Sequence, residues 1–172
     1  MSKTPCEYGG YTGRILRVDL ARRTWDVEPT AAYLPHGIGG RGIAAEIAWN
    51  EISAGCTAFD PIAPLIIMTG PLTGTMAPFS GRTTICGLAP QGYPHEWYTR
   101  SSFGGHWGPE LKYAGFDGVV ITGRADTPVY LEIEDGDCRI RDARPLWGRG
   151  LIDAQKRLID RLGPRWRIFS IG

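Results

Sequence analysis

A glycine-dense stretch with one well-placed arginine is the part of this 172-residue sequence best suited to chemistry. Within residues 70–115, Arg82 follows Ser80-Gly81, and a second turn reads Gly104-Gly105. Glycine permits unusual backbone conformations and lets main-chain N–H groups approach a ligand closely. Such groups beside a guanidinium suit phosphate-like anions. The stretch is therefore predicted to line the site of a large anionic cofactor, although a surface ion pair explains Arg82 equally well on local sequence.

A second glycine-rich motif occupies residues 37–42 and matches the dinucleotide pattern G-x-G-x-x-G. The dinucleotide fingerprint requires a buried strand directly before its first glycine. Here the preceding residues 31–36 are few and contain Pro35. The pattern favours a glycine turn that caps a helix, predicted over residues 43–52, rather than a dinucleotide site.

Other candidate chemistry has weaker support in the sequence. The histidines His36, His95 and His106 lie in unlike contexts, and no serine or cysteine has a Gly-x-Ser-x-Gly type of surrounding. A metal site built from His95, Glu96 and His106 fits no standard ligand spacing. The four cysteines form no Cys-x-x-Cys pair, so no zinc or iron–sulfur site is predicted locally. We assign no catalytic residue and no metal ligand to this chain.

Composition excludes two classes of partner. A formal net charge of +1 gives no reason to expect nucleic acid or an anionic membrane surface. No apolar run approaches the length of a membrane span, and the polar N-terminus is not typical of a secretory signal. We therefore expect a cytoplasmic protein without nucleic-acid or membrane partners, whose residues 1–7 form a disordered tail.

Hydrophobic patterning predicts many short strands and few helices. Alternation predicts one hairpin from residues 13–20 and 24–28, and another from 129–134 and 138–141 through the turn Asp135-Gly136. Further predicted strands cover residues 65–69, 82–88, 117–123 and 166–171, and further helices cover 108–115 and 151–162. Residues 90–100 are predicted to be irregular. Because a domain seldom stops on an apolar strand, we expect the natural protein to continue beyond Gly172.

Several of these segments occur together in one recognisable order. They include Thr69-Gly70-Pro71-Leu72-Thr73-Gly74-Thr75 and Gly81-Arg82, with residues 11–20, 39–42, 104–117, 128–131 and 146–148. This series resembles the N-terminal domain of the aldehyde ferredoxin oxidoreductase family, from about Tyr8 to the end of the chain. The resemblance implies an α+β domain over residues 8–172, truncated at its C-terminal end. Its fold would be β-rich, with two packed mixed sheets and a few short helices.

The resemblance also implies a cofactor. Family members hold tungsten or molybdenum in a bis-pterin cofactor with a bridging magnesium, and oxidise aldehydes to carboxylic acids. Arg82 matches the family arginine that contacts the pterin. Ser102 and Gly104, with Gly105, match the turn whose main-chain atoms hold a pterin phosphate and the magnesium. The family commonly has asparagine and serine where this chain reads Ser102-Phe103, so an amide side-chain contact would be lost here.

Other parts of the family's machinery lie beyond residue 172. These parts are the 4Fe-4S cluster ligands, the catalytic acid and the catalytic histidine, so we expect the isolated chain to be inactive and to need the missing C-terminal domains. Implied partners are ferredoxin or an iron–sulfur electron-transfer subunit, and a homodimer is a further expectation. Two alternatives stay open at this point: a stand-alone module for a smaller phosphate ligand, and a non-catalytic scaffold subunit of a redox complex.

Overall fold

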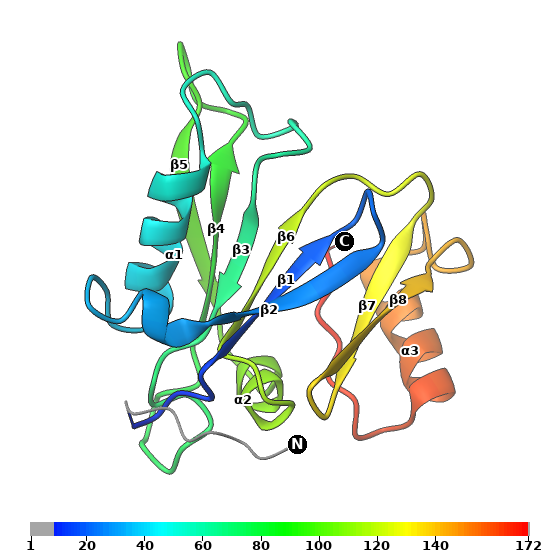
Figure 1. The fold of residues 1–172 in the computed structure, drawn as a ribbon. Coiled ribbons are helices and arrows are strands. Elements are labelled where there is room, and N and C mark those ends of the chain that lie inside the picture. Colours follow the sequence, from blue (N-terminus) through cyan, green and yellow to red (C-terminus); the bar gives the residue numbers. More distant parts are fainter. Residues whose placement is uncertain (1–8, 172) are drawn as a thin grey trace.

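A six-stranded mixed sheet forms the main layer of the protein, seen here in a computed structural model that describes residues 9–171 (Figure 1). The strand order is β2-β1-β6-β3-β4-β5, and only the β1–β6 pair is parallel. The bounds are β1 Arg14–Asp19, β2 Thr24–Pro29, β3 Leu65–Met68, β4 Thr83–Ala89, β5 Trp97–Phe103 and β6 Gly118–Thr122. The tail predicted over residues 1–7 lies outside the described residues.

A two-stranded antiparallel sheet packs against this layer. Its strands are β7 Val129–Glu134 and β8 Asp137–Asp142. At the turn, Asp135 and Gly136 have φ values of 47° and 84°, the positive values that a tight hairpin requires. Apolar side chains of both strands join the main sheet in one core cluster. The predicted α+β fold with two packed sheets is confirmed, except that the second sheet is purely antiparallel rather than mixed.

The middle of the main sheet is buried on both faces, whereas most of its edge strand β5 is exposed. Adjacent residues point to opposite sides of a strand, so Ile15 packs in one core cluster and Leu16 in the other. Val120 and Val119 divide in the same way. Three α-helices and one 3-10 helix accompany the sheets: α1 Gly39–Glu51, α2 Trp107–Tyr113, α3 Leu151–Leu162 and η1 Thr30–Ala32. No helix within residues 9–171 combines the length and apolar character needed to cross a membrane.

Two sequence predictions were wrong. Strand β5 includes residues 97–100 of the segment predicted to be irregular, and it pairs along its whole length with β4. Conversely, residues 166–171 belong to no strand or helix. Phe169 instead stacks on the ring of Phe103, with 4.8 Å between ring centroids. Aromatic packing holds this segment where the sequence predicted backbone pairing.

Candidate anion-binding site

The structure brings the predicted site residues together at one end of the β4–β5 pair. Thr84 lies opposite Ser102 in the ladder, so Arg82, which precedes β4, lies close to the turn that follows β5. The Arg82 Nη1 group donates a hydrogen bond to Ser102 Oγ at 3.3 Å. The Gly104-Gly105 turn follows directly and is exposed, as is Arg82. Sequence order alone separated these groups by about twenty residues, and antiparallel pairing brings them together.

The turn leaves space and hydrogen-bond donors for a ligand. A Cβ atom added at Gly104 or at Gly105 would meet no atom within 4 Å. Gly105 has a φ of 93°, a conformation that favours glycine. Among the described residues, no protein hydrogen bond uses the main-chain N–H groups of these two glycines. Open space, free N–H donors and a guanidinium make a donor set that fits the phosphate of an anionic cofactor.

A second loop, residues 70–80, leads directly into Arg82. The Thr73 hydroxyl accepts a hydrogen bond from the Gly70 N–H at 3.2 Å and donates one to the Ser80 carbonyl at 2.9 Å. Tyr113 on α2 donates its hydroxyl hydrogen to the Gly74 carbonyl at 2.8 Å. The loop is therefore closed on itself and tied to α2 just before Arg82.

Helix α2 sits directly against β4 because one of its residues has no side chain. A Cβ atom at Gly108 would lie only 2.2 Å from Thr83 Oγ1. Thr83 is fully buried, and its hydroxyl has no hydrogen-bond partner among the described residues. The close approach sets the position of the turn that leads into α2, which contains Gly104 and Gly105.

A buried ion pair, Lys112 with Asp117, lies next to the start of the loop formed by residues 70–80. Lys112 Nζ and Asp117 Oδ1 are 3.5 Å apart, and their side chains are only 7% and 1% exposed. Burial lowers the pKa of the Lys112 ammonium, and Asp117 opposes that shift. Sequence reasoning missed both residues. The available signal was a lysine inside the short helix, five residues before the aspartate that precedes a buried strand.

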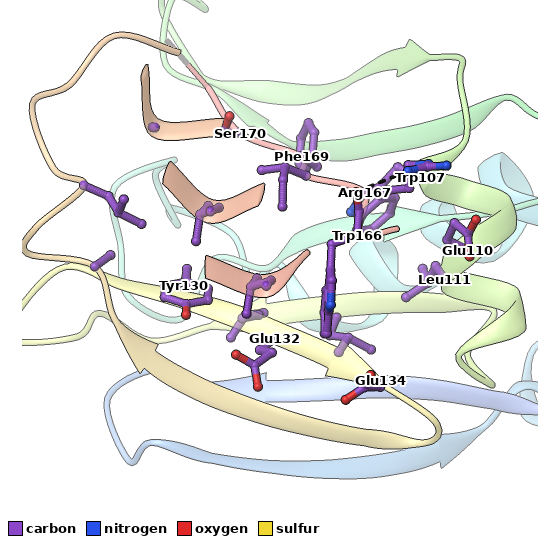
Figure 2. Close-up of a pocket in the computed structure, with 18 of the residues that line it drawn as sticks. Trp107, Glu110, Leu111, Tyr130, Glu132, Glu134, Trp166, Arg167, Phe169 and Ser170 are labelled. Atoms are coloured by element: carbon purple, nitrogen blue, oxygen red, sulfur yellow. Dashed lines mark hydrogen bonds between the residues drawn. The ribbon is translucent and has the colours of Figure 1, made fainter. Parts of the chain in front are cut away.

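A large cavity is a separate feature. It has a volume of about 1380 Å³ and lies among α2, β7, α3 and residues 163–171. Figure 2 shows Trp107, Trp166, Phe169, Tyr130 and Glu132 among the residues that line it. Its lining is mainly apolar, and none of the four predicted site residues belongs to it. An apolar wall disfavours a multiply charged group, so this cavity is not the predicted anion site.

The buried carboxylate of Glu132, which lines this cavity, is paired with two arginines. Glu132 Oε1 accepts hydrogen bonds from Arg139 and Arg141, each at 3.2 Å. Burial raises the pKa of Glu132, but the hydrogen bonds from Arg141 and Arg139 outweigh burial and leave the pKa below its usual value. Glu132 is therefore a paired structural charge rather than a free acid or base.

The other sequence candidates do not form sites. Within residues 9–171, no group of three or more His, Cys, Asp or Glu side chains could hold a metal ion. Glu96 instead accepts a hydrogen bond from the Ala58 N–H. The G-x-G-x-x-G motif follows η1 and a turn rather than a buried strand, and α1 begins inside the motif at Gly39, earlier than the predicted residue 43. A glycine turn that starts a helix is therefore the correct interpretation.

Comparison with known proteins identifies relatives of this chain. The tungsten-containing aldehyde ferredoxin oxidoreductase of Pyrococcus abyssi is 39% identical over 166 residues, which are 95% of this chain and 27% of that protein. The aliphatic sulfonate oxidoreductase, WOR-like subunit, of Pyrococcus furiosus is 37% identical over 153 residues, covering 87% of this chain and 24% of that protein. This chain thus spans about a quarter of the length of these relatives.

A solved structure has the same fold. The active site complex BamBC of benzoyl-coenzyme A reductase, in complex with 1,5-dienoyl-CoA, superposes with a TM-score of 0.86 at 34% identity. The match covers 91% of this chain and 24% of that chain. The family model described as the aldehyde ferredoxin oxidoreductase N-terminal domain matches residues 15–172. The chain belongs to the aldehyde ferredoxin oxidoreductase family.

Proposed function

We propose that this chain forms one wall of the binding site for a tungsten- or molybdenum-bearing bis-pterin cofactor in an oxidoreductase. The observation that carries the proposal is the convergence of Arg82 and the Gly104-Gly105 turn at one end of β4–β5. The guanidinium and the two glycines are exposed, and the space where the glycines' Cβ atoms would lie is open. Relatives named as tungsten-containing enzymes support this choice of ligand.

Each residue has a distinct proposed task. Arg82 binds a cofactor phosphate through charge-assisted hydrogen bonds, and Ser102 Oγ holds the guanidinium in place. Main-chain atoms of Ser102, Gly104 and Gly105 would hold a cofactor phosphate and its associated magnesium. The bound cofactor supplies the redox chemistry, whereas this chain orients it and shields one side from water.

The overall reaction is proposed for the complete protein, because this chain spans only about a quarter of its relatives. We propose oxidation of an aldehyde with water to a carboxylic acid, with ferredoxin or an iron–sulfur subunit as acceptor of the two electrons. A 4Fe-4S cluster would be held outside this chain. The names of the relatives differ in substrate: aldehydes, aliphatic sulfonates and a benzoyl-coenzyme A compound. Residues outside this domain would then select the substrate.

Replacement of Arg82 tests the proposal. In the complete protein, Arg82→Ala should reduce bound tungsten plus molybdenum, measured by elemental analysis, about tenfold or more. A hydrogen bond to a charged group contributes roughly 1.5–3 kcal/mol, and about 1.4 kcal/mol is tenfold in affinity. Arg82→Lys keeps the charge but not the planar fork, so a smaller loss is expected.

Arg22→Ala is the matched control, because the Arg22 side chain is 82% exposed and lies on the β1–β2 turn. Equal metal content in Arg82→Ala and Arg22→Ala would contradict the proposal. Binding of a simple phosphate compound at Arg82 without any metal in the complete protein would favour the stand-alone phosphate module instead.

A further inference from the structure

The Lys112 ammonium lies where several main-chain carbonyl oxygens converge. Lys112 Nζ donates to the carbonyls of Gly70 and Pro71 at 3.3 and 3.4 Å, and also to the carbonyl of Gly10. These carbonyls come from two different loops, one near the N-terminus and one that leads to Arg82. Carbonyl oxygens that face one another repel, so a cation between them is needed to hold the two loops together.

Asp117 holds the same centre from the opposite side. Its carboxylate accepts hydrogen bonds from the N–H groups of Thr12 and Gly13, each at 2.9 Å, and from the Thr30 hydroxyl at 2.7 Å. Its main-chain carbonyl accepts from Thr69 as well. A buried carboxylate with this many donors is fixed in position, and it fixes the ammonium beside it.

Two structural connections lead from Lys112 to the candidate anion site, one through hydrogen bonds and one along the chain of α2. Along the first, the Gly70 carbonyl begins the loop that Thr73 closes onto Ser80, two residues before Arg82. Along the second, Lys112 lies on α2, whose N-terminal end directly follows the turn formed by Gly104 and Gly105. The two halves of the anion site therefore meet at one ammonium group.

We propose that Lys112, held by Asp117, is a positioning residue that sets the distance between Arg82 and the Gly104-Gly105 turn. The inference rests on the proposed function, because it assigns Lys112 to the site that would bind the cofactor phosphate. Lys112 touches no ligand in this account. It acts by donating hydrogen bonds to the carbonyls of Gly70 and Pro71. These bonds join the loop formed by residues 70–80 to α2.

Lys112→Met tests the proposal in the complete protein. Methionine keeps most of the side-chain volume and removes the cation. Arg17→Met is the matched control, because Arg17 also bridges elements through charged hydrogen bonds, to Glu28 and Glu51, without contacting either loop. We expect amide exchange in peptides covering residues 70–81 and 101–107 to become at least tenfold faster in Lys112→Met, and metal content to fall. Arg17→Met should leave both readouts unchanged.

A chemical rescue separates a specific ammonium from general packing. In Lys112→Ala, propylammonium replaces the missing carbons and the N–H donors, whereas tetramethylammonium brings the same charge without donors. Restored protection of residues 70–81 by propylammonium alone supports the proposal. Equal behaviour with the two cations, or equal exchange in Lys112→Met and Arg17→Met, overturns it.

The same experiment separates the inference from the proposed function. If residues 70–81 exchange faster in Lys112→Met while Arg82→Ala keeps its full metal content, the loops are positioned by Lys112 but the proposed function fails. If Arg82→Ala loses metal while Lys112→Met exchanges normally, the proposed function survives and the positioning role fails.

Discussion

The two glycine-rich regions of this protein use glycine for opposite reasons. At residues 37–42 the protein itself fills the space that a side chain would take: a Cβ atom at Gly40 would lie 2.9 Å from the Met68 carbonyl oxygen. At Gly104 and Gly105 the corresponding space is empty. The first region lets α1 pack closely on β3, whereas the second leaves two exposed glycines with open space beside the exposed Arg82.

The role of a glycine motif therefore depends on the atoms that surround it. Residues 37–42 match the better-known sequence pattern, yet their glycines are used for packing. The Gly104-Gly105 pair matches no general nucleotide motif, yet it is exposed, has open space around it and lies near Arg82. Where the protein occupies the space beside a glycine, a structural role follows, and where the space is open beside a cation, ligand binding is the better hypothesis.

The largest effect on stability is expected at the packed glycine. Gly40→Ala places a methyl group against the β3 backbone, which cannot rotate away, and should lower the free energy of unfolding by about 1–3 kcal/mol. Alanine is otherwise the better helix former, so helix propensity alone predicts a gain. Urea unfolding of the chain distinguishes the expected loss from the expected gain. Unchanged or increased stability would show that the space beside Gly40 is not filled by the protein.

The opposite result is expected at the open glycine. Gly104 is not among the glycines with positive φ, and no atom lies within 4 Å of its added Cβ, so Gly104→Ala should change the free energy of unfolding by less than about 0.5 kcal/mol. The methyl group would nevertheless occupy the proposed ligand space. Metal content of the complete protein should therefore fall, and native metal content in this variant would remove Gly104 from the site.

Much of the fold could be predicted from local patterns. Alternating apolar residues located the β1–β2 hairpin, and Asp135-Gly136 located the β7–β8 turn, because both signals depend on neighbours in sequence. Strand β5 was missed because it is an exposed edge strand, and its residues Trp97 to Phe103 lack the apolar alternation of a buried face. The predicted strand at residues 166–171 failed because apolar residues pack equally well without a paired backbone.

Only part of the site could be predicted, because local patterns do not reveal contacts between residues far apart in sequence. Arg82, Ser102, Gly104 and Gly105 were singled out by glycine content and by family resemblance, and the structure places them together. Their role as cofactor contacts stays a prediction. Lys112 and Asp117 were missed because their partners are main-chain groups of residues far away in sequence, which no local pattern reveals.

Amide hydrogen exchange of the Gly104-Gly105 turn tests the central claim most directly. If the Gly104-Gly105 turn binds the cofactor, a peptide covering residues 101–107 exchanges fast in the cofactor-free complete protein. The same peptide is strongly protected once the tungsten or molybdenum cofactor is bound. We expect this protection at residues 101–107 and 70–82 but not at residues 37–42, because the glycines at 37–42 serve packing rather than ligand binding. Equal exchange at residues 101–107 with and without the cofactor would contradict it.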